Sequence, residues 1–244
     1  MNKLLSEAVK AHGGLERWRN FNTIRATIVS GGQLFVQKGL PQDPTPREMT
    51  VSLHEQQASL SPFGAPDQRT RFMADRVAIE KLDGTVVAER NNPRASFDSH
   101  ELMTAWDPLQ RAYFNGYALW IYLTSPFALT MPGFVIEDIA PWQEGSETWR
   151  GLSATFPAWI ASHSTKQEFY FGDDGLLRRH DYRVDVAGGF TAAQYVDQVQ
   201  EFDGLKFPTR RRAYMRDEQG RPVLDAEMVF IHLGNIRLSR ATLS

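Results

Sequence analysis

The chain has 244 residues, of which 42% are hydrophobic, and its formal net charge at pH 7 is -2. This length and apolar fraction suffice for the core of one large domain, so we predict a single domain over residues 1–244. A net charge near zero excludes a general electrostatic attraction to nucleic acid or to anionic membranes. The absence of cysteine excludes disulfides, thiolate catalysis and cysteine-ligated metal centres.

The N-terminal segment has the pattern of an amphipathic helix. Its apolar residues share one helical stripe between residues 2 and 19, which Gly13 and Gly14 interrupt near its end. The segment lacks the apolar stretch of an export signal, and no window of the chain is as long as a membrane span. We therefore expect a soluble cytoplasmic protein that does not insert into membranes.

Short apolar runs separated by turns follow this helix. Met49, Val51 and Leu53 alternate with polar residues, and Asp83-Gly84 is a strong hairpin turn. These patterns predict strands at 23–30, 34–38, 48–53, 57–60, 70–73, 77–82 and 86–89.

The segment 106–127 is the richest in aromatic residues and predicts a helix. Asp107 is suited to the N-cap, Pro108 to the first helical position, and Pro126 ends the pattern. Its large apolar rings occur on nearly all sides, so we expect this aromatic helix to be sandwiched between other elements.

The second half of the chain again predicts strands, at 134–139, 148–156, 167–171, 176–186, 192–202, 207–216 and 223–238. Short polar connections such as Gly188-Gly189 and Asp203-Gly204 indicate an antiparallel meander. The predicted fold class is mainly β (α+β). We expect one strongly curved antiparallel sheet, a half-barrel of about eleven strands, wrapped around the N-terminal helix and the aromatic helix.

Four segments carry a resemblance to a known group: Ala11-His12-Gly13-Gly14 to Trp18, the aromatic helix, and the stretches 169–179 and 202–211. They resemble uncharacterised bacterial proteins with the fold of the lipoprotein carriers LolA and LolB. The resemblance implies a half-barrel whose apolar cavity binds an acyl chain or another apolar molecule. It implies neither lipoprotein transport nor any catalytic residue.

Strand 176–186 supplies the first candidate site residues. Period-2 alternation places Arg178, His180 and Tyr182 on one face, and Arg179 and Asp181 on the other, which we interpret as the solvent face. The first three would bind an anionic or carbonyl group, with His180 as acid or base. In the alternative interpretation Arg178 lies at the rim of the sheet and His180 is structural.

The next strands supply possible partners. Tyr195 and Asp197 share a face of strand 192–202, where Asp197 would orient His180, but the sequence leaves open whether this face or the opposite one points inward. Arg211 alternates with Phe207 and is expected inside. Its neighbours in the basic run face solvent, so we predict no nucleic-acid binding.

His163 is a candidate for a second acid or base, although a loop histidine bonded to Ser162 or Ser164 is the simpler interpretation. The other histidines show no metal-ligand spacing, so no metal site is predicted. Motifs for a catalytic nucleophile, a nucleotide phosphate or a dinucleotide are absent, and we predict no cofactor.

On the aromatic helix, Tyr113, Tyr117 and Trp120 are the candidate ligand-binding residues. Packing alone explains most of the rings, but a tyrosine hydroxyl that reaches a cavity would contact a ligand. The leading hypothesis is that the protein binds an apolar or amphiphilic small molecule between the concave sheet and this helix. The alternative is a cofactor-independent isomerase, cyclase or lyase that uses His180, His163 or Asp197 for proton transfer and Arg178 or Arg211 to hold charge. A protein-interaction module is a third hypothesis.

Overall fold

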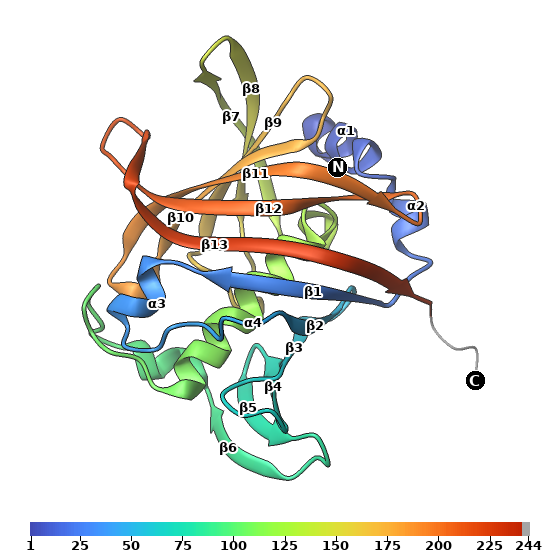
Figure 1. The fold of residues 1–244 in the computed structure, drawn as a ribbon. Coiled ribbons are helices and arrows are strands. Elements are labelled where there is room, and N and C mark those ends of the chain that lie inside the picture. Colours follow the sequence, from blue (N-terminus) through green and yellow to red (C-terminus); the bar gives the residue numbers. More distant parts are fainter. Residues whose placement is uncertain (241–244) are drawn as a thin grey trace.

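A computed structural model describes residues 1–240 of the protein. All of its strands join one antiparallel sheet, in the order β6-β5-β4-β3-β2-β1-β13-β12-β11-β10-β9-β8-β7 (Figure 1). The strands are β1 (Thr23–Gly31), β2 (Arg47–Ser52), β3 (Gln57–Ser61), β4 (Gln68–Met73), β5 (Arg76–Lys81), β6 (Val86–Asn91), β7 (Val135–Glu144), β8 (Glu147–Thr155), β9 (Lys166–Phe171), β10 (Leu177–Val184), β11 (Phe190–Phe202), β12 (Leu205–Arg216) and β13 (Pro222–Ser239).

The helices are fewer and, with one exception, short. They are α1 (Lys3–Ala11), α2 (Leu15–Trp18), α3 (Gln33–Gln37) and α4 (Pro108–Thr124), with the 3-10 helices η1 (Pro93–Phe97), η2 (Phe127–Thr130) and η3 (Asp185–Ala187). No helix of residues 1–240 is long and apolar enough to cross a membrane.

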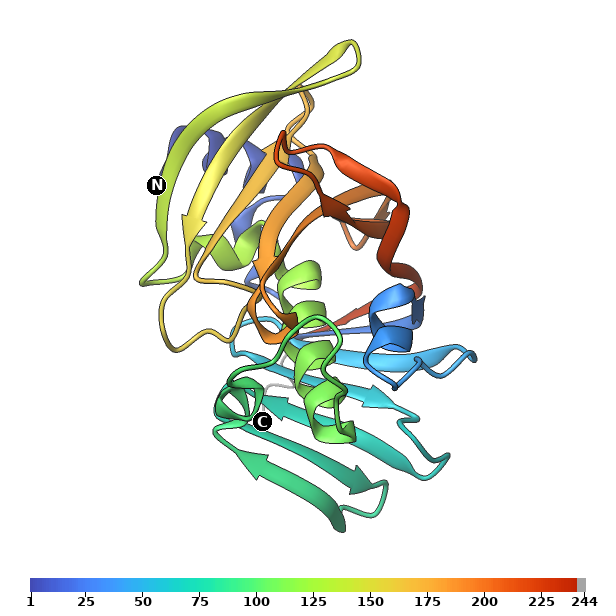
Figure 2. The same cartoon turned by 90° about the vertical axis from the view of Figure 1, so that its left-hand side faces the viewer.

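The sheet consists of two meanders joined at one seam. We call β1–β6 the first wing and β7–β13 the second wing; within each wing, strands that follow one another in sequence are paired. The seam is the pairing of β1 with β13, where Thr23 lies opposite Ser239. The sheet curves strongly and α4 lies in its hollow (Figure 2). The predicted half-barrel is confirmed, with thirteen strands in place of about eleven.

α4 begins and ends where the sequence predicts. The Asp107 side chain accepts a hydrogen bond from the Gln110 N–H, and the Gln110 side chain accepts one from the Asp107 N–H, which completes a capping box. Ser125 is extended, as expected of the residue before Pro126. Every residue from Leu109 to Thr124 is buried, so the helix is the core of the half-barrel rather than a cover on its surface.

Two predicted elements differ from the structure. Segment 34–38 is predicted as a strand, but residues 34–37 lie in α3, because a short apolar run alone does not distinguish a strand from a helical turn. The predicted N-terminal helix breaks after Ala11, where Gly13 has φ +117°. A side chain at Gly13 would also collide with the Gly204 carbonyl oxygen, so the chain turns there before α2.

The convex face of β10 is not the open solvent face that alternation predicts. Arg179 and Asp181 are 0% and 2% exposed and form a bidentate ion pair at 2.6 Å. The Arg179 guanidinium lies 4.1 Å from the Trp142 ring, and Arg216 donates a second ion pair to Asp181. The β7–β8 hairpin therefore folds over this part of the sheet, which strand alternation by itself does not reveal.

Candidate functional site

Polar side chains meet deep inside the half-barrel, between α4 and the second wing. We call them the interior polar cluster: Tyr117, Tyr122, His163, Tyr182, Gln194 and Arg211. The Tyr122 hydroxyl is hydrogen-bonded both to His163 Nε2, at 2.7 Å, and to the Tyr182 hydroxyl, at 2.8 Å. The Gln194 amide donates to the Tyr182 hydroxyl at 3.3 Å. Buried polar groups need such partners, and a connected network fixes their positions.

His163 enters this cluster from the connection between β8 and β9. We call residues 156–165 the strap; its ends are tied together by a hydrogen bond from the Phe156 N–H to the Thr165 carbonyl. The His163 ring stacks on the Tyr182 ring at 4.0 Å and lies 3.3 Å from the Tyr117 hydroxyl through Nδ1. His163 thus fills space that the resemblance assigned to an apolar ligand.

Two side chains attach the strap to the first wing and to the η1 helix that follows it. Gln56, in the turn between β2 and β3, donates to the Ala161 carbonyl at 2.7 Å and accepts from the Ala161 N–H at 2.8 Å. Arg94, in η1, donates to the Ser162 carbonyl at 2.6 Å. The strap therefore bridges the two wings through hydrogen bonds to its backbone.

Two histidines are held neutral by burial. Burial, together with the charge of Arg94, holds the pKa of His163 well below its usual value. Burial also lowers the pKa of His180 strongly, with the nearby charge of Arg211 acting in the same direction. His180 is hydrogen-bonded through Nε2 to the Gln167 side chain at 2.7 Å and stacks on Phe169 at 4.1 Å. Neither ring titrates near neutral pH in this environment.

An open cavity lies at the mouth of the half-barrel, between the ends of the two wings. This mouth cavity has a volume of about 620 Å³. Tyr113 of α4, one of the predicted ligand-binding residues, lines this cavity. The other lining residues are Ala74, Asp75, Asn92, Arg94, Phe156, Pro157, Ala158, Trp159, Ile160, Ala161, Ser162 and Thr165. The strap thus forms one wall, and its Trp159 is 50% exposed.

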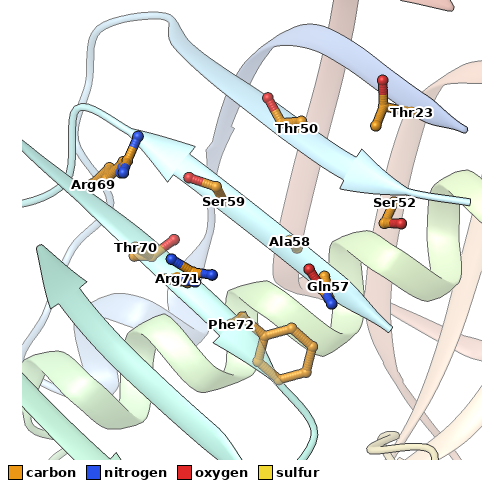
Figure 3. A pocket seen from close by; sticks show the side chains of 10 residues that line it. All are labelled: Thr23, Thr50, Ser52, Gln57, Ala58, Ser59, Arg69, Thr70, Arg71 and Phe72. Atoms are coloured by element: carbon orange, nitrogen blue, oxygen red, sulfur yellow. The ribbon is translucent and has the colours of Figure 1, made fainter. Parts of the chain in front are cut away.

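A second hollow lies on the convex face of the first wing (Figure 3). Its volume is about 310 Å³, and Thr50, Ser52, Gln57 and Ser59 line it together with Arg69. These residues alternate along β2 and β3 with Met49, Val51, Ala58 and Leu60, which face α4. We call it the polar hollow. These five polar side chains point away from the interior, and the polar hollow shares no lining residue with the mouth cavity.

Several predicted site residues lie outside the interior polar cluster. Arg178 is at the rim and pairs with Asp174 at 2.6 Å. Tyr195 and Asp197 lie on the convex face, where Tyr195 accepts from Arg179 and Asp197 pairs with Arg210 at 2.6 Å. The prediction that they accompany His180 is corrected: the inward face of β11 carries Ala192, Gln194 and Val196.

The aromatic helix residues have three different surroundings. Trp120 is fully buried, and its indole N–H donates to the Ser52 and Glu55 carbonyls at 2.8 and 2.9 Å, which fixes α4 against the first wing. Tyr117 belongs to the interior polar cluster. Tyr113 lines the mouth cavity, whereas Tyr117 and Trp120 do not.

Sequence reasoning missed four glutamine and arginine residues of this site. Gln194 lies on the face of β11 opposite to Tyr195 and Asp197, and Gln167 is the polar partner of His180. Gln56 and Arg94 come from turns, where no periodic pattern signals orientation. Within residues 1–240, no three His, Asp or Glu side chains are grouped so as to hold a metal ion.

No family model and no curated protein matches the sequence. Solved structures are similar in fold. A LolA superfamily protein from Nitrosomonas europaea is 8% identical with a TM-score of 0.54, covering 98% of this chain and 93% of that chain. A Vibrio parahaemolyticus domain described as outer membrane lipoprotein-sorting is 8% identical with a TM-score of 0.53, covering 97% and 91%. A DUF1329 family protein from Desulfovibrio piger is 10% identical with a TM-score of 0.53, covering 99% and 93%.

These neighbours correct one prediction and confirm another. The expectation of a cytoplasmic protein is contradicted, because the neighbours include a domain whose description is putative outer membrane lipoprotein-sorting protein domain. Identities of 8–10% over nearly the full length carry information on architecture alone. The protein has the LolA-like half-barrel fold.

Proposed function

We propose that the protein binds an apolar or amphiphilic small molecule in the mouth cavity. The observation that carries this proposal is the cavity itself: about 620 Å³, walled by Tyr113, Phe156, Trp159 and Ile160. Ligand sites are concave, largely apolar and in the range of 300–1,000 Å³. The fold supports the proposal, since the LolA superfamily protein and the lipoprotein-sorting domain share this architecture.

The proposed site differs in position from the one the sequence suggested. The space between the concave sheet and α4 is occupied by aromatic rings and the interior polar cluster. The mouth cavity continues from that space toward solvent, with Tyr113 between the two. A ligand would lie over Tyr113 and against the strap.

Nothing favours the acid–base enzyme over this binding function. His163 and His180 are 0% and 1% exposed, and neither lines the mouth cavity. Asp197, the third proposed proton carrier, is on the convex face and paired with Arg210. A binding protein requires no titratable pair at its cavity, whereas an acid–base enzyme does.

A cavity-filling variant tests the proposal. Ala158→Trp places a large ring at the mouth cavity, and Ser59→Trp places the same ring at the polar hollow as a matched control. We expect Ala158→Trp to weaken binding of the neutral fluorescent probe N-phenyl-1-naphthylamine at least about tenfold, and Ser59→Trp to leave it unchanged. An unchanged affinity in Ala158→Trp, or no binding by the unmodified protein, would contradict the proposal.

We also infer that the protein acts outside the cytoplasm. The support is the description of the Vibrio parahaemolyticus neighbour as an outer membrane lipoprotein-sorting domain. Fractionation of the native host by osmotic shock is expected to release the protein with the periplasmic markers. Recovery with a cytoplasmic marker enzyme would overturn this inference.

A further inference from the structure

The interior polar cluster contains a positive charge with no counter-charge. Arg211 is 2% exposed; its guanidinium donates to the Gln194 side chain at 3.0 Å and to the Tyr122 carbonyl, and its Nε has no partner. Its neighbours Arg210 and Arg212 pair with Asp197 and Glu227. Arg211 has no carboxylate within 4.0 Å among residues 1–240.

The groups around Arg211 do not supply the missing charge. Burial raises the pKa of Tyr122 to about 12 and raises that of Tyr182 well above its usual value, so both phenols are neutral. His163 and His180 are neutral as well. Burial lowers the pKa of Arg211 itself to about 10, which leaves it protonated at neutral pH. A lone buried cation is costly unless a negative charge pairs with it.

The end of α4 compensates in part. The Tyr122 carbonyl belongs to the last turn of the helix, and a helix C-terminus carries about half a negative charge. That partial charge explains why Arg211 points there. It leaves the Nε–H without a hydrogen-bond partner.

The surroundings are suited to an anion. Arg211 carries a planar guanidinium of the kind that pairs with a carboxylate or phosphate, and it lies 5.0 Å from the Tyr122 ring. Gln194 joins it to the Tyr182 hydroxyl. The Tyr122 hydroxyl bonds to His163 and to the Tyr182 hydroxyl. If His163 moved out with the strap, the freed Tyr122 hydroxyl would become available to a ligand.

We propose that Arg211 is the receptor for the anionic head group of an amphiphile whose apolar chain lies in the mouth cavity. This inference rests on the proposed function and names its ligand class: an acyl or alkyl chain with a single carboxylate or phosphate head. The strap, with His163 on its inner side and Ile160 and Ala161 lining the mouth cavity, separates the two parts of the site. Binding therefore requires the strap to lift.

Matched probes test the head group. Oleate, oleyl phosphate and oleyl alcohol share one chain and differ in charge, and displacement of N-phenyl-1-naphthylamine at pH 8 measures their affinities. We expect one or both anions to bind at least about tenfold more tightly than the alcohol, and the tighter of the two identifies the head. Arg211→Met should reduce this preference to about twofold or less while the affinity for the alcohol stays unchanged.

Arg210→Met is the matched control, because Arg210 is next to Arg211 on β12 but lies on the convex face and pairs with Asp197 at 2.6 Å. It should keep the preference for anions. Equal binding of all three probes, or a preference lost in Arg210→Met and kept in Arg211→Met, would overturn the inference. Absence of binding by all three would contradict the proposed function itself.

A second variant keeps the test informative if Arg211→Met does not fold. Gln194→Glu places a carboxylate where the Gln194 oxygen already accepts from Arg211. The internal counter-charge should raise the melting temperature and abolish the preference for anions, since it occupies the place of the ligand's head. A Gln194→Glu protein that folds and still prefers oleate or oleyl phosphate tenfold would contradict the role of Arg211.

Discussion

At the residue scale, the Tyr122 hydroxyl is the junction of the interior polar cluster. It is the group that joins His163 of the strap to Tyr182 of β10, at 2.7 and 2.8 Å. Both partners are buried, so neither finds water when the hydroxyl is removed. One oxygen atom thus connects the second wing, the strap and α4.

Tyr122→Phe should lower the free energy of unfolding by about 1–3 kcal/mol, because it leaves buried polar atoms without a partner. Tyr117→Phe removes only the 3.3 Å contact to His163 Nδ1 and should cost less. Urea denaturation at pH 7 measures both. Equal losses in the two variants would show that Tyr122 has no special place in the network.

Buried neutral histidines make stability depend on pH. Burial lowers the pKa of His12 to about 4, and the pKa values of His163 and His180 are lowered more strongly still. Below pH 6.5 the unfolded chain binds protons at these positions and the folded chain does not. The contribution of these neutral histidines to the free energy of unfolding is therefore complete above pH 6.5. It decreases as the pH falls, and for His12 the decrease continues to about pH 4.

We expect the free energy of unfolding to fall between pH 6.5 and 5 by up to about 1.4 kcal/mol per pH unit for each such histidine. His180→Met removes one titrating group and should reduce this slope, whatever it does to stability at pH 7. The control is His232→Gln at an exposed position, which should leave the slope unchanged. Urea denaturation at a series of pH values measures the slope, and identical slopes in all three proteins would exclude this explanation.

Alternation along strands predicts which residues lie inside where a strand is regular. His180 and Tyr182 of β10 and Arg211 of β12 are buried on the inner side as expected, and their part in binding stays a prediction. Arg178 is at the rim because the pairing of β10 with β9 shifts register between Leu177 and Arg179. No sequence pattern signals such a shift.

At the element scale, the strap depends on a few specific bonds. Gln56→Ala removes both of its hydrogen bonds to Ala161, whereas Gln57→Ala removes only an exposed bond to Glu55. We expect Gln56→Ala to speed amide hydrogen exchange in residues 159–163 at least about tenfold, because local opening becomes easier. Gln57→Ala should not change it. Unchanged exchange in Gln56→Ala would show that other contacts hold the strap.

α4 passes very close to β4 at one glycine. A Cβ on Gly116 would lie 2.2 Å from Phe72 Cγ, far inside contact distance. Glycine to alanine normally stabilises a helix by about 1 kcal/mol. Here we expect Gly116→Ala to destabilise the protein by about 1–3 kcal/mol through overpacking, as measured by thermal and urea unfolding. A stabilised variant would mean that α4 is free to shift on the sheet.

The elements of this fold are largely readable from sequence, and the connections are not. Each of the thirteen strands overlaps a predicted strand segment, because alternation and turn residues mark them, and the capping residues mark α4. The strap has neither signal: its position depends on Gln56 and Arg94, which are distant in sequence. The proposed binding site therefore differs in position from the predicted one, because the strap forms a wall of the mouth cavity.

At the scale of the whole molecule, one sheet includes every strand and α4 is fixed to both wings. Trp120 bonds to the first wing, while Arg211 of the second wing bonds to the Tyr122 carbonyl. We therefore expect residues 1–244 to unfold as one domain. Far-UV circular dichroism and tryptophan fluorescence should give coincident urea transitions, and two separated transitions would contradict the single-domain prediction.

The seam between β1 and β13 has a consequence for how the newly made chain folds. The first wing and α4 are synthesised early, yet β1 has no partner on its outer side until residues 222–239 exist. A growing chain therefore exposes the edge of β1, and contacts between segments so far apart in sequence form slowly. We expect delayed closure of this seam to expose a nascent chain to aggregation, because an unpaired strand edge is a template for pairing with another chain.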